Sequence, residues 1–131
     1  QWIDNATTSN VKRPVVINLE NTSPLTDNID SIFSANTLHI ISWPLVQKFF
    51  DMASKQLAIN GILCIYGPFN YQRKYTSESN ANFDLWLKAR NEESGIRDFE
   101  AISQLAEKGN FILEEDIEMP ANNRMLFFKK R

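Results

Sequence analysis

Apolar and polar positions follow two alternating patterns along the chain, which predict strands and helices in turn. Short apolar, β-branched runs predict buried strands at residues 14–19, 29–36 and 62–66. Between the last two, apolar residues recur at helical spacing after Pro44. Pro at the first turn and Asn60-Gly61 at the end predict an amphipathic helix between them.

The second half of the chain predicts a helical insertion followed by a hairpin. Residues 70–97 include a polar stretch and a short helix at 81–89, and we interpret them as a lid or substrate insertion. Asp98 is expected to cap a further helix that closes at Gly109. Residues 111–119 and 125–130 then form a hairpin. This order predicts an α/β fold with a largely parallel sheet and an antiparallel last strand pair.

Composition limits the class of protein and its partners. With 43% hydrophobic residues in 131, the chain supports one core, so residues 1–131 are expected to form a single domain. The balance of 14 basic and 16 acidic residues predicts no binding to nucleic acid or to an anionic membrane. The single Cys64 lies in an apolar run, which favours a reducing, cytoplasmic location. The chain opens at Gln1 without Met, and we expect it to be a piece of something longer.

Several kinds of site are not indicated by the motifs. The four glycines fit neither the dinucleotide fingerprint nor the P-loop spacing. One His and one Cys do not supply a zinc ligand set, so no metal is predicted.

Polar and backbone-exposing residues follow two of the predicted parallel strands. Asn36 and His39 come after one strand, and Gly67 comes after the next. Ligands of open parallel sheets bind at the carboxyl ends of strands. We therefore predict a pocket lined by Asn36, His39, Gly67 and Phe69. His39 is the candidate catalytic base, although an imidazole bonded to a backbone carbonyl is an equally open interpretation.

Five separated motifs carry a resemblance to a known family. They are Asn36-Thr37-Leu38-His39-Ile40 with Trp43, Tyr66-Gly67-Pro68-Phe69, Ser79-Asn80-Ala81-Asn82-Phe83-Asp84 with Arg90, Gly95-Ile96-Arg97-Asp98, and Glu118-Met119-Pro120-Ala121-Asn122-Asn123. In this order they resemble the DUF938 family of methyltransferase-like protein 26-like proteins. The resemblance implies a class I methyltransferase fold that uses S-adenosylmethionine as its cofactor.

The resemblance also implies which part of that fold is present. The Rossmann-like sheet has the order 3-2-1-4-5-7-6 with strand 7 antiparallel, and this chain would be its C-terminal part, strands 3 to 7. Strands 1 and 2, with the glycine-rich cofactor loop, would be missing. We expect the fragment to bind S-adenosylmethionine weakly or not at all and to be inactive by itself. The strand at 29–36 would then have a free edge, which could pair in a dimer.

Individual roles follow from the same resemblance. The cofactor side would be formed by Asn18, Asn36, His39 and Trp43; Asn18 replaces an Asp of the family pattern and carries no charge. The substrate side would be formed by Gly67, Phe69, Asn80, Asp84, Arg90, Arg97, Asn122 and Asn123. Structural roles remain open for some of them: a helix cap for Asn80, a turn for Asn122 and Asn123, and an ion pair for Arg97 with Asp98.

Two functions are compatible with these features. The first is transfer of a methyl group from S-adenosylmethionine to an unknown small-molecule or protein substrate, which needs alignment and exclusion of water more than ionisable groups. The alternative is a non-catalytic protein of the same fold that binds a ligand or a partner through the same crevice.

Overall fold

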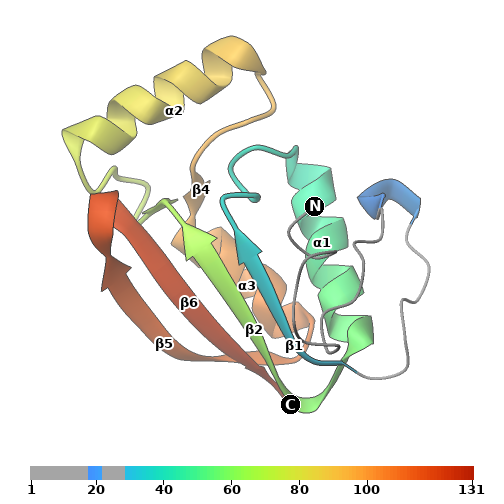
Figure 1. Ribbon diagram of the computed structural model, residues 1–131. Helices are drawn as coiled ribbons and strands as arrows, with labels where there is room; N and C mark the ends of the chain where they lie inside the picture. Colours follow the sequence, from blue (N-terminus) through green and yellow to red (C-terminus); the bar gives the residue numbers. More distant parts are fainter. Residues whose placement is uncertain (1–17, 22–28) are drawn as a thin grey trace, which may run out of the picture.

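The computed structural model of the chain describes residues 18–21 and 29–131 (Figure 1). In chain order its elements are η1 (Leu19–Asn21), β1 (Ile29–Ala35), α1 (Trp43–Gln56), β2 (Leu57–Gly67), β3 (Phe69–Asn70), α2 (Glu78–Arg90), β4 (Arg97–Asp98), α3 (Phe99–Lys108), β5 (Phe111–Met119), η2 (Pro120–Asn122) and β6 (Asn123–Lys130). Among the described residues, no helix is both long and apolar enough to span a bilayer.

Four strands form the main sheet, in the order β1-β2-β6-β5. β1 runs parallel to β2, with Ala35 opposite Tyr66, while β6 is antiparallel to both β2 and β5. The predicted α/β fold with an antiparallel final pair is confirmed. The order also equals 4-5-7-6 of the sheet that the family resemblance implies. Of the described strands, β1 pairs only with β2 and forms one edge.

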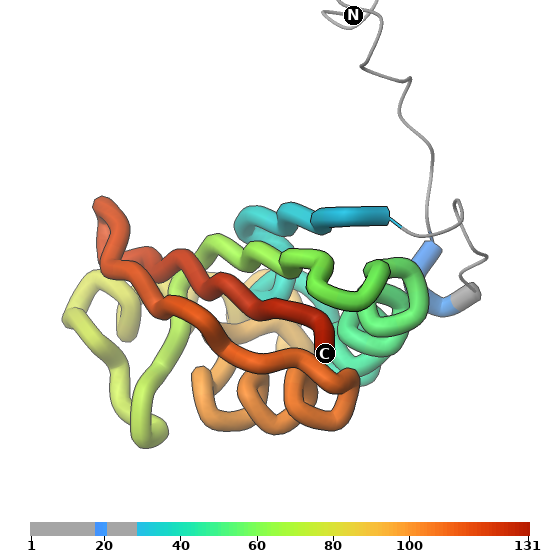
Figure 2. The backbone as a smooth tube through the Cα atoms, turned by 90° about the horizontal axis from the view of Figure 1, so that it is seen from below, coloured from blue at the N-terminus to red at the C-terminus, as the bar shows by residue number. Residues whose placement is uncertain are grey.

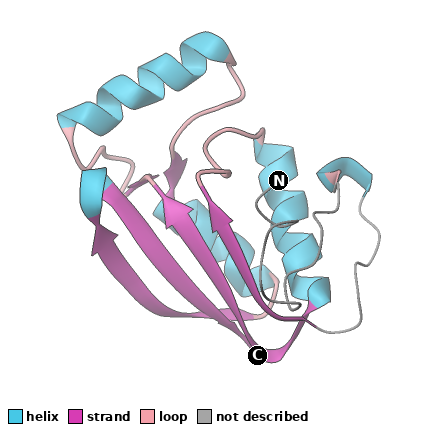
Figure 3. Cartoon of the chain, in the orientation of Figure 1, coloured by secondary structure: helices cyan, strands magenta, loops and turns pink. Residues whose placement is uncertain are grey.

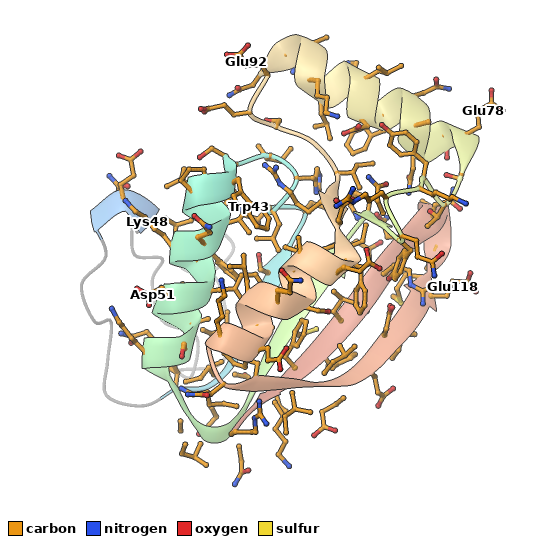
Figure 4. The ribbon with its side chains drawn as sticks, turned by 180° about the vertical axis from the view of Figure 1, so that it is seen from behind. Trp43, Lys48, Asp51, Glu78, Glu92 and Glu118 are labelled. Carbon is orange, nitrogen blue, oxygen red and sulfur yellow. The ribbon has the colours of Figure 1, made fainter. Side chains whose placement is uncertain are left out.

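Helices α1 and α3 pack on the same face of this sheet, where the core lies (Figures 2 and 4). Strand alternation sends every second side chain of β2 and β6 to that face. The most completely buried core side chains are Val46, Ala53, Leu63, Ile65, Ile102, Ala106, Leu126 and Phe128. The helices predicted from apolar spacing therefore bury the face that the spacing defines.

No helix among the described elements covers the opposite face of the sheet (Figure 2), and this face carries apolar side chains. Phe33, Cys64 and Phe127 lie opposite one another on three adjacent strands. Phe33, on the edge strand, is 63% exposed. Strand β1 thus contributes the half-buried Ile32 to the core and the exposed Phe33 to the opposite face.

The end of α1 differs from the sequence expectation. The helix ends at Gln56, and Leu57 is extended (φ −77°, ψ 134°), four residues before the predicted stop at Asn60-Gly61. Those two residues form an irregularity in β2, because Ile29 lies opposite Leu57 but Ser31 lies opposite Ile62. Asn60 is left-handed (φ 70°), and a β-carbon on Gly61 would lie 2.8 Å from the carbonyl oxygen of Ala58. Asn60-Gly61 therefore forms a β-bulge and does not end the helix.

The predicted first strand, residues 14–19, is only partly within the described structure (Figure 3). Residues 14–17 lie outside it, and Leu19 begins the short 3-10 helix η1 instead of ending a strand. A side-chain turn accounts for this, because Asn18 Oδ1 accepts a hydrogen bond from the Glu20 N–H at 3.0 Å.

The insertion at 70–97 is closed at its base by strands that the sequence did not predict. β3 pairs with β4 in parallel, with Phe69 opposite Arg97 and Asn70 opposite Asp98. Its helix α2 is longer than the predicted 81–89, because Ser77 accepts a hydrogen bond from the Asn80 N–H and caps it. α2 lies beyond the carboxyl ends of β1 and β2 (Figure 1).

Candidate functional site

The carboxyl ends of β1 and β2 bring Asn36, His39 and Gly67 together. Asn36 is left-handed (φ 54°), and its N–H donates to the Tyr66 carbonyl oxygen at 2.9 Å. A β-carbon placed on Gly67 would lie 3.6 Å from His39 Nδ1 and 4.0 Å from Asn36 Oδ1. The meeting of these three residues at one end of the sheet agrees with the prediction, while a pocket lined by them together with Phe69 stays a prediction. The polar atoms His39 Nδ1 and Asn36 Oδ1 therefore lie beside the position that a β-carbon on Gly67 would occupy.

His39 is a buried imidazole, 5% exposed. Burial, and secondarily the nearby Arg97 cation, lower its pKa below the usual 6.5. No hydrogen bond joins the ring to another described residue, and its ring meets Phe83 edge-on at 5.5 Å between centroids. A neutral imidazole whose nitrogens have no partner in the described structure is able to accept a proton.

A second segment holds the turn that carries His39. Four consecutive carbonyl oxygens, from Leu38 to Ile41, accept hydrogen bonds from residues 94–97. The donors are Arg97 Nε to Leu38 (3.0 Å), Gly95 N to His39 (2.9 Å), Ser94 Oγ to Ile40 (2.5 Å) and Arg97 Nη2 to Ile41 (2.5 Å). The position of His39 therefore depends on the end of the insertion.

Asp84 anchors the same segment from the other side. Its carboxylate is 1% exposed; Oδ1 accepts from the Ile96 N–H at 2.8 Å, and Oδ2 accepts from Tyr75 (2.5 Å) and Lys88 (2.9 Å). Burial raises the pKa of Asp84, but these hydrogen bonds outweigh it and hold the pKa below its ordinary value. Asp84 and Arg97, predicted for the substrate side, are thus engaged inside the fold. Their contact with a substrate stays a prediction.

The hairpin tip forms a pocket of about 440 Å³ beside the start of α2. Its lining consists of Thr76, Glu118, Met119, Ala121, Asn122, Asn123 and Arg124. Hydrogen bonds from Asn80 Nδ2 to the Asn122 carbonyl (3.3 Å) and from Asn122 Nδ2 to Ser79 Oγ (3.1 Å) tie the tip to α2. Figure 4 places Glu118 on the hairpin and Glu78 at the start of α2. The structure thus brings together the three asparagines predicted for the substrate side.

The remaining predicted residues make other contacts. Trp43 begins α1, and the Arg97 guanidinium lies 5.7 Å from its ring centre. Phe69 belongs to the core and is 2% exposed. Asn18 sits in the turn before η1. Arg90 lies over the Trp86 ring at 4.7 Å.

Sequence reasoning missed several residues that shape the site. Ser94 and Gly95 donate hydrogen bonds to the turn that carries His39, and no sequence motif predicts these hydrogen bonds. Phe83 meets the His39 ring edge-on at 5.5 Å between centroids and stacks on Trp86 at 5.8 Å. The spacing of Phe83, Trp86 and Arg90, three and four residues apart, is a signal that could have found this group.

Comparison with known proteins gives the same fold. A family model described as "Protein of unknown function (DUF938)" matches residues 1–130. The chain is similar to an O-methyltransferase family 2 protein from Planctomyces limnophilus in complex with apigenin, with TM-score 0.73, 18% identity, and coverage of 81% of this chain and 31% of that one. It is similar to mitomycin 7-O-methyltransferase (TM-score 0.72, 16% identity, 87% and 32% covered). It is also similar to human N-acetylserotonin methyltransferase in complex with S-adenosylmethionine (TM-score 0.72, 13% identity, 83% and 31% covered).

At sequence identities this low, the similarity to the solved structures establishes the methyltransferase fold and no substrate or residue role. The chain spans about a third of the length of the solved neighbours. Within the described residues, no cluster of three or more His, Cys, Asp or Glu side chains could hold a metal ion.

Proposed function

We propose that the chain, which belongs to the DUF938 family, is the C-terminal part of an S-adenosylmethionine-dependent methyltransferase whose acceptor reacts beside His39. The observation that carries the proposal is the convergence of His39 Nδ1 and Asn36 Oδ1 over Gly67. It lies at the carboxyl ends of parallel strands, where this class of sheet binds ligands.

The residues at this position fit the cofactor on chemical grounds. Gly67 leaves the strand end open, and the two groups around it are uncharged at neutral pH. Asn36, His39 and Trp43 would hold the methionine end, and Asn18 is proposed as an adenine contact. When bound, S-adenosylmethionine supplies an electrophilic methyl group. Most of the cofactor contacts are proposed to come from a part of the protein beyond these 131 residues, so the chain alone should bind it weakly and be inactive.

His39 is proposed to accept the proton of the methyl acceptor. Its lowered pKa keeps the imidazole neutral, and its burial excludes water from the reacting groups. The pocket at the hairpin tip, with Asn122 and Asn123, lies along the same edge of the sheet, because Gly67 is opposite Arg124. It is proposed to bind a non-reacting part of the small-molecule or protein substrate. Gly67, Phe69, Asn80, Asp84, Arg90 and Arg97 stay proposed for the substrate side, outside the lining of this pocket.

The test uses the full-length protein and a methyl-labelled cofactor with a library of candidate acceptors. His39→Gln should lower kcat by a factor on the order of 100 and weaken cofactor affinity, measured by calorimetry, to a much smaller extent. Asn36→Ala should weaken cofactor binding. Asn82→Ala is the matched control, since Asn82 is an exposed amide on α2.

Two results would contradict the proposal. Absence of cofactor binding by the full-length protein would exclude a methyltransferase. Cofactor binding without methyl transfer to any acceptor, unaffected by His39→Gln, would favour the non-catalytic ligand-binding protein instead.

A further inference from the structure

The pocket at the end of the final hairpin has the size of a small-molecule site. Its volume is about 440 Å³. We call it the tip pocket, and its polar lining consists of Thr76, Glu118, Asn122, Asn123 and Arg124. Asn123 Nδ2 donates a hydrogen bond to the Tyr66 hydroxyl at 3.1 Å, and Tyr66 directly precedes Gly67 in β2. One hydrogen bond therefore joins the tip pocket to the strand that ends at the candidate site.

Both asparagines of the tip pocket use their amide nitrogens inside the protein. Asn122 Nδ2 donates to Ser79 Oγ at 3.1 Å. Asn123 Nδ2 donates to the Tyr66 hydroxyl at 3.1 Å and to the Pro120 carbonyl oxygen at 3.3 Å. Neither Oδ1 atom accepts a hydrogen bond from another described residue. The groups left for a ligand are therefore two amide oxygens, which accept hydrogen bonds and do not donate them.

The charged residues of the tip pocket leave a carboxylate available. Arg124 donates from Nε to Asp116 Oδ1 at 2.9 Å and from Nη2 to the Asp116 carbonyl oxygen at 3.4 Å. Its Nη1 lies 3.8 Å from Glu118 Oε1, which is too far for a hydrogen bond. The Glu118 side chain is 88% exposed and accepts no hydrogen bond from another described residue. Because Asp116 offsets the charge of Arg124, these three side chains together carry one negative charge.

The hairpin backbone holds these acceptors in place. Ala121 and Asn122 are consecutive left-handed residues (φ 61° and 60°), a conformation that costs energy for residues with a β-carbon. Hydrogen bonds to α2 maintain it, because Asn80 Nδ2 donates to the Asn122 carbonyl oxygen at 3.3 Å and Asn122 Nδ2 donates to Ser79. Polar groups fixed by such contacts are preorganised for a ligand.

We propose that the tip pocket binds a primary alkylammonium group. An ammonium has three N–H donors and no acceptor. The pocket offers it three acceptors, which are the carboxylate of Glu118 and the Oδ1 atoms of Asn122 and Asn123. The alkyl stem contacts Met119 and Ala121, the apolar members of the lining. An anion would depend instead on Arg124, whose Nε and Nη2 are already engaged with Asp116.

This inference rests on the proposed function, which assigns the tip pocket to a non-reacting part of the methyl acceptor. The acceptor is then an amine whose second group reacts beside His39. Two sources carry this chemistry: a small alkylamine, and the lysine side chain of a protein substrate.

The test measures binding to the isotope-labelled full-length protein without cofactor, through the NMR signals of the Asn122 and Asn123 side-chain amides. The probes are pentylamine, which is protonated at about pH 7, uncharged pentanol, anionic pentanoate, and N,N,N-trimethylpentylammonium, which keeps the charge but has no N–H donor. We expect pentylammonium to bind about tenfold more tightly than the other three, because each of them lacks the charged hydrogen bonds.

A short peptide distinguishes the two sources of the ammonium. The probe is a tripeptide with a central lysine and blocked ends. Tighter binding of this peptide than of pentylamine assigns the tip pocket to a protein substrate, and weaker binding assigns it to a small amine. Both results support the proposed ammonium site.

Matched variants separate the tip pocket from the general charge of the hairpin. Glu118→Gln should weaken pentylammonium binding roughly threefold to fivefold and leave pentanol unchanged. Glu115→Gln is the control, because Glu115 is an exposed carboxylate of the same strand outside the lining, and it should change neither. Asn122→Asp, which also adopts the left-handed conformation, should tighten pentylammonium and weaken pentanoate. Circular dichroism checks that each variant is folded.

Several results would overturn this inference: no measurable binding of pentylammonium, equal affinity for pentanol or for the trimethylated cation, tighter binding of pentanoate, or an equal loss in Glu115→Gln and Glu118→Gln. Failure of the two proposals is distinguishable. Ammonium binding in the tip pocket without cofactor binding or methyl transfer removes the proposed function. Methyl transfer that depends on His39, without ammonium binding, removes only the ammonium site.

Discussion

The main sheet and the insertion are held by different forces. The sheet buries apolar side chains such as Val46, Leu63 and Ile102 completely between its strands, α1 and α3. The insertion buries Leu87 but depends on polar contacts of Asp84 and Arg97. Apolar burial is spread over many contacts and makes a region cooperative, whereas a few hydrogen bonds can open separately.

The difference places stability and the candidate chemistry in different parts of the chain. The His39 turn is packed on the sheet side through Leu38 and held on the insertion side through residues 94–97. A change in the sheet should therefore affect the whole fold, and a change in the insertion should affect first the position of His39.

The largest effect is expected from the sheet. Phe128→Ala removes a ring that is 1% exposed and should reduce the free energy of unfolding by about 3–5 kcal/mol. Urea denaturation measures the loss. Phe33→Ala is the matched control, because the same side chain on the uncovered face should cost less than about 1 kcal/mol. A loss in Phe33→Ala as large as that in Phe128→Ala would mean that the second face is covered in solution.

A smaller and local effect is expected from the insertion. Asp84→Asn weakens the bonds to Tyr75 and Lys88 and should cost about 1–3 kcal/mol. Hydrogen exchange should become faster at the backbone amides of Gly95 and Ile96, and the exchange rates of core amides should change less.

The control is a second Asp–Lys pair at the same spacing. Asp51 and Lys55 lie on the outer side of α1 and are 66% and 72% exposed (Figure 4). Asp51→Asn should cost no more than about 0.5 kcal/mol. If both variants lost the same stability, burial of Asp84 would have no energetic importance.

A substitution at the hairpin tip is expected to raise the stability of the fold instead of lowering it. Ala121 has a left-handed conformation (φ 61°), which Asn adopts more readily than Ala. Ala121→Asn should raise stability by about 0.5–1 kcal/mol, seen as a higher melting temperature. Ala89→Asn, in the helical α2, should lower it by about 0.5 kcal/mol. A decrease in both variants would contradict the strain assigned to Ala121.

The smallest effect is expected from pH. Since the pKa of His39 is lowered on folding, the unfolded chain binds the proton more readily. The stability that neutral His39 contributes is complete above its usual pKa of 6.5. It is lost as the pH falls through 6.5 toward the lower pKa of the folded state. The urea concentration at the unfolding midpoint should decrease as the pH is lowered from about 7.5 to about 5.5. His39→Gln should make this slope of midpoint against pH smaller. An unchanged slope in the variant would assign the effect to other groups.

The fold could be predicted because its elements follow local patterns. Short apolar runs located β1 and β2, a turn between two segments located β5 and β6, and helical spacing located α1 and α3. The end of α1 was wrong, because Asn60-Gly61 fits a bulge as well as a helix stop. The short strands β3 and β4 have two residues each, too few for a pattern.

The candidate site was predictable only where the topology alone decides it. Parallel strands place Asn36 and Gly67 at one edge, which requires no knowledge of side-chain direction. The bonds of Arg97 and Gly95 to the His39 turn connect residues more than 50 positions apart, and nothing in their local sequence specifies the partner.

The pairing of β3 with β4 gives the insertion the properties of an exchangeable module. Phe69 and Arg97 are neighbours across this pair, so the excursion leaves and re-enters the fold at one place. The register of the four main strands does not depend on the length of the segment between β3 and β4, because the two ends of that segment are neighbours. Changes in length and sequence can then accumulate in one contiguous stretch while the sheet that supports it stays the same.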